Sequence, residues 1–346
     1  VNPNGIIFGK DSTVDVHALI ASTLDIADAA FLSGNISFTG DSEAAVINLG
    51  SIEADSFAAL IGGKVTNAGS ITSRGGDVAL LAGDAILEVG EASGGKITLD
   101  LSGLLEGTAD NSGSIDVAAS TMKGGSATIL GERVSVEGLV DASGAIGGGQ
   151  VLIGGDYQGS NLDFSNAQTA NVSGSIFADS SSSGDGGRVI IWADGVTTFT
   201  GDLSATGSGA GSGGFAEISG KDILNFEGSV DLTSASGVSG TLLLDPTNII
   251  ISNVGSHTSI SGSTTLEPSA AAGSVISLST LNTALGSSNV IIQTAAGGGS
   301  ETGNISVDSG LAITGSNDLT IIADGDVTMI SGSINLGSGD LSVTAG

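Results

Sequence analysis

Short apolar runs that alternate with polar residues follow one another along the whole chain. Val134 and Val136 share one face of such a run, and Ile305 and Val307 share one face of another. A period of two residues is typical of β-strands that are buried on one side. Gly, Ser, Asn and Asp separate the runs, and these residues favour tight turns. The pattern therefore predicts many short strands joined by turns.

A phrase of the form x-Gly-Ser-Ile or x-Gly-Ser-Val begins many of these runs. Its copies are Gly50-Ser51-Ile52, Gly69-Ser70-Ile71, Gly113-Ser114-Ile115, Gly174-Ser175-Ile176, Gly228-Ser229-Val230 and Gly332-Ser333-Ile334. The first two copies are 19 residues apart and the third lies 44 further on, a distance that we interpret as two periods. We expect every copy to occupy an equivalent corner of the fold, with Ile52, Ile71, Ile115 and Ile176 pointing inward.

Paired glycines mark a second repeat. They begin Gly75-Gly76-Asp77-Val78, Gly94-Gly95-Lys96-Ile97, Gly148-Gly149-Gln150-Val151, Gly186-Gly187-Arg188-Val189 and Gly213-Gly214-Phe215-Ala216. A unit this short cannot bury its own apolar face and must stack on its neighbours. Stacked strands of one chain are parallel, and their crossovers are right-handed. The sequence predicts an all-β fold, a right-handed parallel β-helix (β-solenoid) of about 14–17 coils.

Two segments break the repeat. Leu278, Leu281 and Leu285 are spaced as on one face of a helix, with Ser277 as its cap, which predicts one short helix on the flank of the solenoid. The Ser/Thr/Ala-rich stretch that begins near residue 254 indicates an insertion. We therefore expect a first block, 1–253, of continuous coils, and a second block, 254–346, of further repeats after the insertion.

Composition supports a long, narrow and acidic molecule. Glycine supplies 58 of the 346 residues, and aromatic residues only 3%, which suits a thin core of aliphatic side chains. The 37 acidic and 8 basic residues give a net charge of −29. A charge of this sign argues against nucleic acid and against anionic membrane surfaces as partners. The sequence contains no Cys and no apolar run long enough to span a membrane, so we expect no disulfides and no membrane span.

The first residues carry a specific motif. Asn2-Pro3-Asn4-Gly5-Ile6, followed by Ala21-Ser22-Thr23-Leu24-Asp25-Ile26, resembles the secretion domain of two-partner-secreted exoproteins, the filamentous haemagglutinin family of Gram-negative bacteria. Three later phrases resemble recurrent segments of the large adhesins in that family: 75–82, 240–246 and 319–327. Family members carry another Asn-Pro-Asn motif and further strands upstream of Val1. We therefore expect this chain to be a piece of a longer protein.

The resemblance implies a function. Members of the family are secreted or cell-surface adhesins that serve as structural rods in attachment and biofilm formation. Their partners are an outer-membrane transporter and a receptor on a host cell, on a bacterial surface or in exopolysaccharide. Two alternatives remain: the stalk of a contact-dependent toxin-delivery exoprotein, and a β-helix enzyme that acts on polysaccharides. The missing C-terminal region would distinguish the adhesin from the toxin stalk.

The motif at Asn2, Pro3, Asn4 and Gly5 has two interpretations. Asn, Pro and Gly at the first, second and fourth positions favour a type I turn, so the segment can be simply a bend in one coil. The resemblance adds that it helps to display the region that the transporter recognises. Both interpretations can hold together.

Little in the sequence indicates further chemistry. The two His residues are far apart, no nucleophile motif is present, and the basic residues are scattered, so we expect no catalytic residues and no enzyme. Asp324-Gly325-Asp326 resembles a fragment of a Ca²⁺ loop, which makes Asp324 and Asp326 candidate ligands for Ca²⁺, although isolated acidic turns of this kind are usually just solvated. Trp192 lies in an apolar run, where it packs in the core or stacks on a sugar. No other cofactor is expected.

Overall fold

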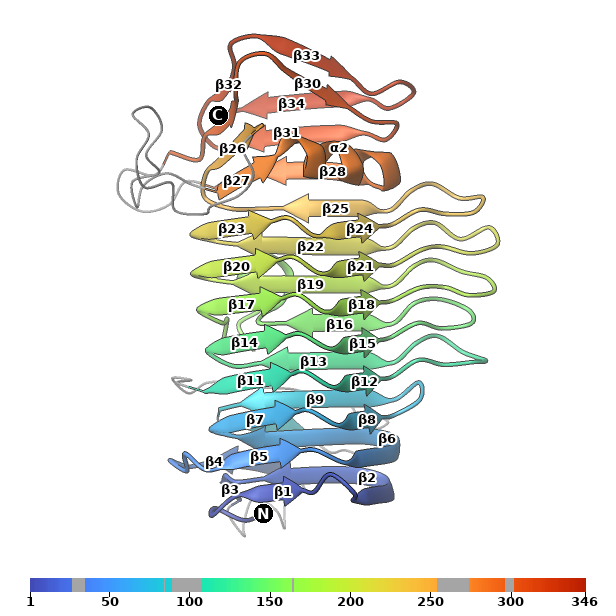
Figure 1. Cartoon of the computed structure of the whole chain (residues 1–346), viewed down its shortest axis with the longest axis vertical. Helices are drawn as coiled ribbons and strands as arrows, with labels where there is room; N and C mark the ends of the chain where they lie inside the picture. Colours follow the sequence, from blue (N-terminus) through green and yellow to red (C-terminus); the bar gives the residue numbers. More distant parts are fainter. Residues whose placement is uncertain (27–34, 84, 89–106, 164, 254–273, 296–301) are drawn as a thin grey trace.

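The structure is a stack of coils along one long axis (Figure 1). It is a computed structural model that describes residues 1–26, 35–83, 85–88, 107–163, 165–253, 274–295 and 302–346. Most coils of the stack contribute strands to three sides, and on each of these sides the strands of neighbouring coils pair in parallel. The parallel β-helix predicted from the sequence is therefore confirmed.

The first side is a ladder of twelve strands. In spatial order they are β1 (Ile6–Phe8), β5 (Ala45–Asn48), β7 (Lys64–Asn67), β11 (Thr108–Asn111), β14 (Arg133–Val136), β17 (Thr169–Val172), β20 (Val196–Phe199), β23 (Ile223–Phe226), β27 (Ser274–Ser277), β26 (Ile249–Ser252), β29 (Ile305–Val307) and β32 (Val327–Met329).

The second and third sides begin with two long strands that take part in both, β2 (Thr13–Ser22) and β6 (Ser51–Gly62). The second side continues with β8 (Ser70–Thr72), β12 (Ser114–Asp116), β15 (Leu139–Asp141), β18 (Ser175–Phe177), β21 (Asp202–Ser204) and β24 (Ser229–Asp231). The third side continues with β9 (Asp77–Ala82), β13 (Ser126–Leu130), β16 (Gln150–Ile153), β19 (Arg188–Ala193), β22 (Phe215–Gly220), β25 (Thr241–Leu244), β28 (Asn289–Gln293), β31 (Leu319–Ala323) and β34 (Leu341–Ala345).

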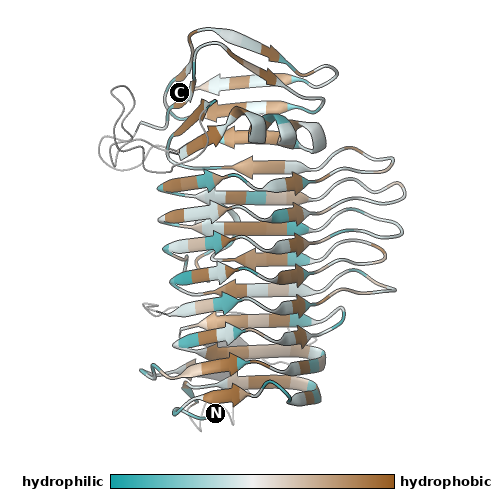
Figure 2. Cartoon of the chain, in the orientation of Figure 1, coloured by the Kyte–Doolittle hydropathy of each residue, from teal (hydrophilic) through white to brown (hydrophobic). Residues whose placement is uncertain are grey.

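The x-Gly-Ser-Ile phrases form the corner between the first and second sides. Ile52, Ile71, Ile115 and Ile176 point inward and are fully buried, as predicted. Ile71 pairs directly with Ile115 on the neighbouring strand. The hydropathy colouring shows the apolar bands repeating from coil to coil (Figure 2). Burying one such side chain contributes about 1.5–3 kcal/mol, so the stack is stabilised coil by coil.

Glycine is required at this corner because successive coils approach too closely for a side chain. A Cβ at Gly113 would lie 2.0 Å from the carbonyl oxygen of Gly69, and a Cβ at Gly138 would lie 1.9 Å from that of Gly113. The same carbonyls accept backbone hydrogen bonds from the residue after each glycine, such as Leu139 N–H to Gly113 O at 2.9 Å. The column of stacked glycines therefore fixes the register of the coils.

The spacing of 44 residues is one coil and not two, so our interpretation of it was wrong. The pairing of Ile71 with Ile115 leaves no coil between them, and the additional residues are an insertion within that coil. Two coils also lack the expected phrase: Gly138-Leu139-Val140 and Gly201-Asp202-Leu203 occupy the same corner without Ser. In the part of the chain that the structure describes, the first side has twelve strands, fewer than the about 14–17 coils predicted.

The paired-glycine repeats begin strands of the third side, where β9, β16, β19 and β22 start within two residues of them. The copy at Gly94 lies outside the described residues. The helix is also confirmed: α2 (Leu278–Ser287) is capped by Ser277, whose hydroxyl accepts from the Thr280 N–H at 3.0 Å. It buries Leu281 and Leu285 where the other coils have a short strand of the second side.

The proposed boundary near residue 253 falls beside a stretch that the structure does not describe, 254–273. Strands on both sides of it belong to the same ladders, because β28 pairs with β25 and β27 pairs with β23. The strand β27 also lies between β23 and β26, although it follows both in the sequence. The blocks 1–253 and 254–346 are thus stacked, and their division into domains remains a prediction.

Two layers cover parts of the outer surface of the third side. Near the N-terminus, the antiparallel strands β3 (Asp25–Ile26), β4 (Asn35–Thr39) and β10 (Ala85–Glu88) form a small sheet. Its Phe38 packs with the outward-facing Ile61 and Leu81 in a separate apolar cluster. Farther along, the chain between β16 and β17 folds back over β19 and β22. We call residues 154–163 and 165–168 the cover loop; it contains the 3-10 turn Tyr157–Gly159. Past α2, β30 (Leu311–Thr314) pairs in parallel with β33 (Gly332–Asn335) and takes the place of a second-side strand, with Leu311 and Ile313 in the main core.

Candidate functional site

The Asn-Pro-Asn-Gly motif forms an exposed turn in the first coil. The Gly5 N–H donates to the Asn2 carbonyl at 3.1 Å, the bond that closes a β-turn, and the Asn2 side-chain amide donates to the Gly5 carbonyl at 2.9 Å. The predicted turn is therefore present. It is attached to the rod by the Asn2 N–H, which donates to the Ser22 carbonyl, and by the Ser42 hydroxyl, which donates to the Pro3 carbonyl.

The two asparagines of the turn have different roles in this geometry. The Asn2 side chain closes the turn from both sides, because its carbonyl oxygen also accepts from the Asn4 N–H at 3.2 Å. The Asn4 side chain is exposed and makes no hydrogen bond with a described residue. Asn2 is thus occupied in holding the turn, whereas Asn4 is displayed to solvent.

The candidate Ca²⁺ ligands Asp324 and Asp326 lie in the turn between β31 and β32, and both are exposed. The Asp326 N–H donates to the Asn304 side chain at 2.8 Å. Among the described residues there is no group of three or more His, Cys, Asp or Glu side chains that could hold a metal ion. Ca²⁺ binding at this turn remains a prediction.

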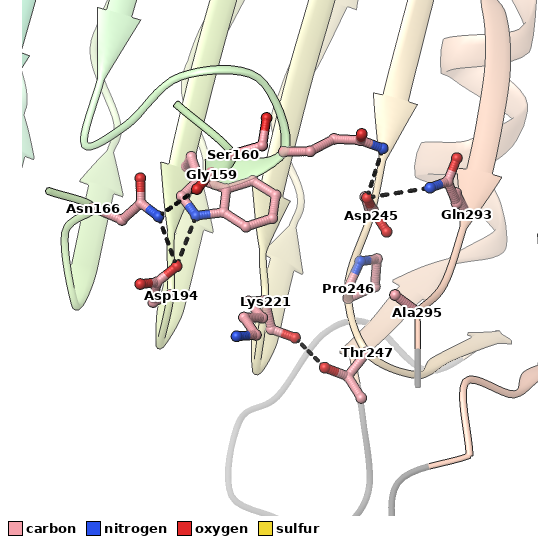
Figure 3. A pocket seen from close by; sticks show the side chains of 12 residues that line it. Gly159, Ser160, Asn166, Asp194, Lys221, Asp245, Pro246, Thr247, Gln293 and Ala295 are labelled. Carbon is pink, nitrogen blue, oxygen red and sulfur yellow. Dashed lines mark hydrogen bonds between the residues drawn. The ribbon is translucent and has the colours of Figure 1, made fainter. Parts of the chain in front are cut away.

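A pocket of about 440 Å³ opens on the outer surface of the third side, next to the cover loop (Figure 3). Residues from five parts of the chain line it, namely the cover loop, the end of β19, the segment after β22, the segment after β25 and the end of β28. Trp192, Asp194, Lys221, Asp245 and Gln293 supply its functional groups. We call it the Trp192 pocket.

The indole of Trp192 and the carboxylate of Asp194 form one wall. The indole N–H donates to Asp194 Oδ1 at 3.0 Å, and the Asn166 amide of the cover loop donates to the same oxygen at 3.0 Å. Trp192 is only 5% exposed and packs with Leu152 and Ile190, the apolar side chains that the cover loop shields from water. The sequence left packing and sugar stacking open for Trp192; it is mainly packed, with part of its ring at the pocket.

Glu217 is buried beneath the cover loop. Its carboxyl group has no exposed surface, and both of its oxygens lie 3.1 Å from the backbone nitrogen of Gln158, which donates to them. Burial raises the pKa of Glu217 to about 8; the Gln158 N–H opposes this shift and the charge of Asp245 adds to it. Gln158 adopts a left-handed backbone conformation, φ 52°, unusual for a residue other than glycine. With its pKa raised to about 8, Glu217 is mostly protonated at neutral pH.

Asp245 faces the pocket from the end of β25. Its Oδ2 accepts from the Gln158 side-chain amide at 3.1 Å and lies 3.5 Å from the Gln293 amide. Burial raises its pKa to about 6, against the stabilising hydrogen bond from Gln158. Gln158 thus contacts two buried acids, Glu217 with its backbone and Asp245 with its side chain.

An ion pair secures the far end of the cover loop. Arg188 donates to Asp156 at 2.9 Å. Burial alone would raise the pKa of Asp156, but hydrogen bonds from Asn161, from the Tyr157 N–H and from Arg188 hold it below its usual value. The Tyr157 ring lies 5.9 Å from that of Phe215, between ring centroids.

The sequence did not indicate this arrangement. It predicted scattered basic residues, yet Arg188 and Lys221 lie on the same face as Asp156, Glu217 and Asp245. In a single sequence these residues are separated by up to 89 positions, and only the stacking of coils brings them together. The one signal available was the polar Glu217 within the apolar strand Phe215–Gly220.

Among the described residues, no helix is long and apolar enough to cross a membrane. No protein-family model matches the chain, and no curated protein matches it either. Among the solved structures that resemble it is the HMW1 secretion domain from Haemophilus influenzae, with a TM-score of 0.60 and 20% sequence identity. The match covers 99% of this chain and 78% of that one. The chain therefore shares the fold of a known secretion domain.

Proposed function

We propose that this chain is the secretion domain and adjoining rod of a filamentous adhesin, exported by a two-partner system to the outside of a Gram-negative cell. The observation that carries the proposal is the exposed Asn2–Gly5 turn in the first coil of a β-helix whose fold matches a secretion domain. The sequence resemblance described above points in the same direction. The partner would be an outer-membrane transporter.

The fold suits export as an extended chain. Each coil adds to the one before it by strand pairing and by burying a few aliphatic side chains, at about 1.5–3 kcal/mol for each large one. The sequence contains no Cys, so no disulfide can form early and block threading. Folding outside the cell would then favour outward movement of the chain and leave a rod at the cell surface. As an adhesin, the rod would serve attachment to cells or to exopolysaccharide, and biofilm formation.

The proposal assigns no catalytic role to the chain. Glu217, the carboxyl group whose pKa is best suited to donate a proton at neutral pH, is sealed beneath the cover loop and does not line the Trp192 pocket. A general acid must contact the substrate. The burial of Glu217 thus supports a structural interpretation over a polysaccharide-cleaving enzyme.

Secretion of the complete exoprotein from cells that carry its transporter tests the proposal. Replacing Asn4 with Ala should reduce the secreted fraction several-fold, while the purified variant keeps its circular dichroism and melting temperature, because the Asn4 side chain supports no described contact. Asp11→Asn, at an exposed turn of the same coil, is the matched control and should be secreted normally. Normal secretion of an Asn2→Ala, Asn4→Ala double variant would reduce the motif to a structural turn.

A further inference from the structure

We propose that the Trp192 pocket binds a neutral sugar unit of a glycan. This inference rests on the proposed adhesive function. It adds to that function the class of receptor that the rod would bind. It is carried by the shape, the free hydrogen-bonding groups and the charge of the pocket.

The size of the pocket fits a small ligand. Its volume of about 440 Å³ falls within the range of small-molecule sites, about 300–1,000 Å³. Trp192, Pro246 and Ala295 supply apolar surface at its walls, and carboxylates, an amide and an ammonium group supply polar atoms. A sugar ring presents the same combination, with C–H groups on its faces and hydroxyl groups around its edge.

Two carboxylate oxygens in the pocket are free to accept hydrogen bonds. Asp194 uses Oδ1 for the Trp192 and Asn166 donors, and Asp245 uses Oδ2 for the Gln158 and Gln293 amides. The second oxygen of each carboxylate has no hydrogen bond with a described residue. Hydroxyl groups donate to such oxygens, and charge-assisted bonds of this kind are among the stronger ones.

Donors for the ligand are present in the same pocket. The Lys221 side chain forms no ion pair with a described residue, and an ammonium group donates up to three hydrogen bonds. The Gln293 amide contacts Asp245 only at 3.5 Å, so it is also free to meet a ligand. A sugar hydroxyl both donates and accepts, and it can therefore bridge the carboxylates and these donors.

The pocket is held in shape before any ligand arrives. Asp194 is fixed by Trp192 and Asn166, and Asp245 by Gln158, which is itself held by its backbone bond to Glu217. Side chains that are already ordered cost little conformational entropy on binding. Sugars make few contacts with proteins and bind weakly. Because the pocket is already ordered, less of the binding free energy is lost to ordering side chains.

Charge favours a neutral sugar over an acidic one. Two carboxylates face one ammonium group in the pocket, and the whole chain carries a net charge of −29. A sialic acid, a uronic acid or a sulfated sugar would be repelled by this field at low salt. The uncharged hexoses and N-acetylhexosamines are free of that repulsion.

Binding by the purified chain is measured by saturation-transfer difference NMR and by Trp192 fluorescence, since Trp192 is the only Trp in the sequence. The probes are the methyl glycosides of glucose, galactose, mannose and N-acetylglucosamine, with sialyllactose as the acidic comparison. We expect at least one neutral glycoside to bind with a millimolar Kd and to shift the Trp192 emission. Sialyllactose should bind at least fivefold more weakly.

Two variants locate the site. Asp245→Ala should weaken binding about tenfold, the effect of losing a charge-assisted hydrogen bond. Gln293→Ala removes only the 3.5 Å contact with Asp245 and should weaken sugar binding about threefold. It provides a second test if Asp245→Ala does not fold. The control is Asp222→Asn, an exposed neighbour of Lys221 that does not line the pocket; it should bind like the parent chain. Binding is then compared between a neutral polysaccharide and a glycoprotein that both carry the preferred sugar, which distinguishes exopolysaccharide from a cell-surface glycoprotein as the source of the sugar.

Several results would overturn the inference. The first is that no neutral glycoside binds at about 20 mM, which is 20-fold the Kd of about 1 mM typical of weak ligands. The second is that sialyllactose binds more strongly than the neutral glycosides. The third is that Asp222→Asn weakens binding as much as Asp245→Ala does. The assay does not involve export. It can therefore fail while the secretion experiment succeeds, or succeed while that experiment fails.

Discussion

The proton on Glu217 should make the cover loop sensitive to alkaline pH. Glu217 is fully buried, its pKa is raised from 4.5 to about 8, and its nearest partner is the N–H of Gln158 in the cover loop. In the unfolded chain the same carboxyl group loses its proton near pH 4.5. Between these two pH values the native protein holds one proton that the unfolded chain has released.

The sign and size of the effect follow from this difference. The free energy of unfolding falls as the pH rises from about 4.5 to about 8, and it levels off above that value. A difference of about 3.5 pH units at about 1.4 kcal/mol each corresponds to about 5 kcal/mol for an isolated group. That cost cannot exceed the free energy of lifting the cover loop from β22, because lifting the loop returns the carboxylate to water. We therefore expect the loop to open near pH 8 and above while the rod stays folded.

Trp192 reports this opening directly, because it is the only Trp and packs beneath the cover loop. Acrylamide quenching of its fluorescence should rise between pH 7 and pH 9.5 in the parent chain, with far-UV circular dichroism unchanged. Glu217→Gln, which cannot ionise, should abolish the rise. Glu227→Gln, a change of the same kind at an exposed position directly after β23, should leave it intact. A rise of equal midpoint in Glu217→Gln would refute the reasoning, as would flat quenching in the parent.

The glycine corner and the acidic turn give two more predictions. Gly138→Ala would place a Cβ 1.9 Å from the Gly113 carbonyl oxygen and should lower the free energy of unfolding, measured in urea, by about 2–3 kcal/mol. Gly286→Ala, whose Cβ would have no atom within 4 Å, should raise that free energy by up to about 1 kcal/mol. Equal stability of the two variants would contradict the register argument. If Asp324 and Asp326 are merely solvated, Ca²⁺ and NaCl at matched ionic strength should raise the melting temperature equally. A Ca²⁺-specific excess that disappears in Asp324→Asn, Asp326→Asn would identify an ion site.

The sequence was sufficient for the coil but not for its outer layers. Alternation and the Gly-Ser-Ile phrases predicted strands, a corner and inward-facing side chains such as Ile115, because those features depend on neighbours in the same or the adjacent coil. The capped helix at Leu278 was predicted for the same reason. Coils that replace Ser by Leu139 or Asp202 were missed, since only the glycine before them is required by the close approach.

The Trp192 pocket could not be predicted, because nothing local specifies it. Trp192 and Glu217 stand on the outward faces of two strands, and alternation alone would leave both in water. They are covered because the chain between β16 and β17 folds back over them, and the length of that segment does not reveal where it goes. The pocket next to it combines groups from coils that follow one another only in space.

Because of the column of stacked glycines, the position of a coil in the rod does not depend on how many residues the coil contains. From Gly50 to Gly69 the chain needs 19 residues, and from Gly69 to Gly113 it needs 44, yet both steps end on the same carbonyl-to-glycine contact. A coil can therefore differ in length without shifting the coils above or below it. This makes the rod a natural carrier for grafted peptides: a foreign loop inserted within the Gly69–Gly113 coil would be displayed laterally, while the aliphatic interior remains that of the parent chain.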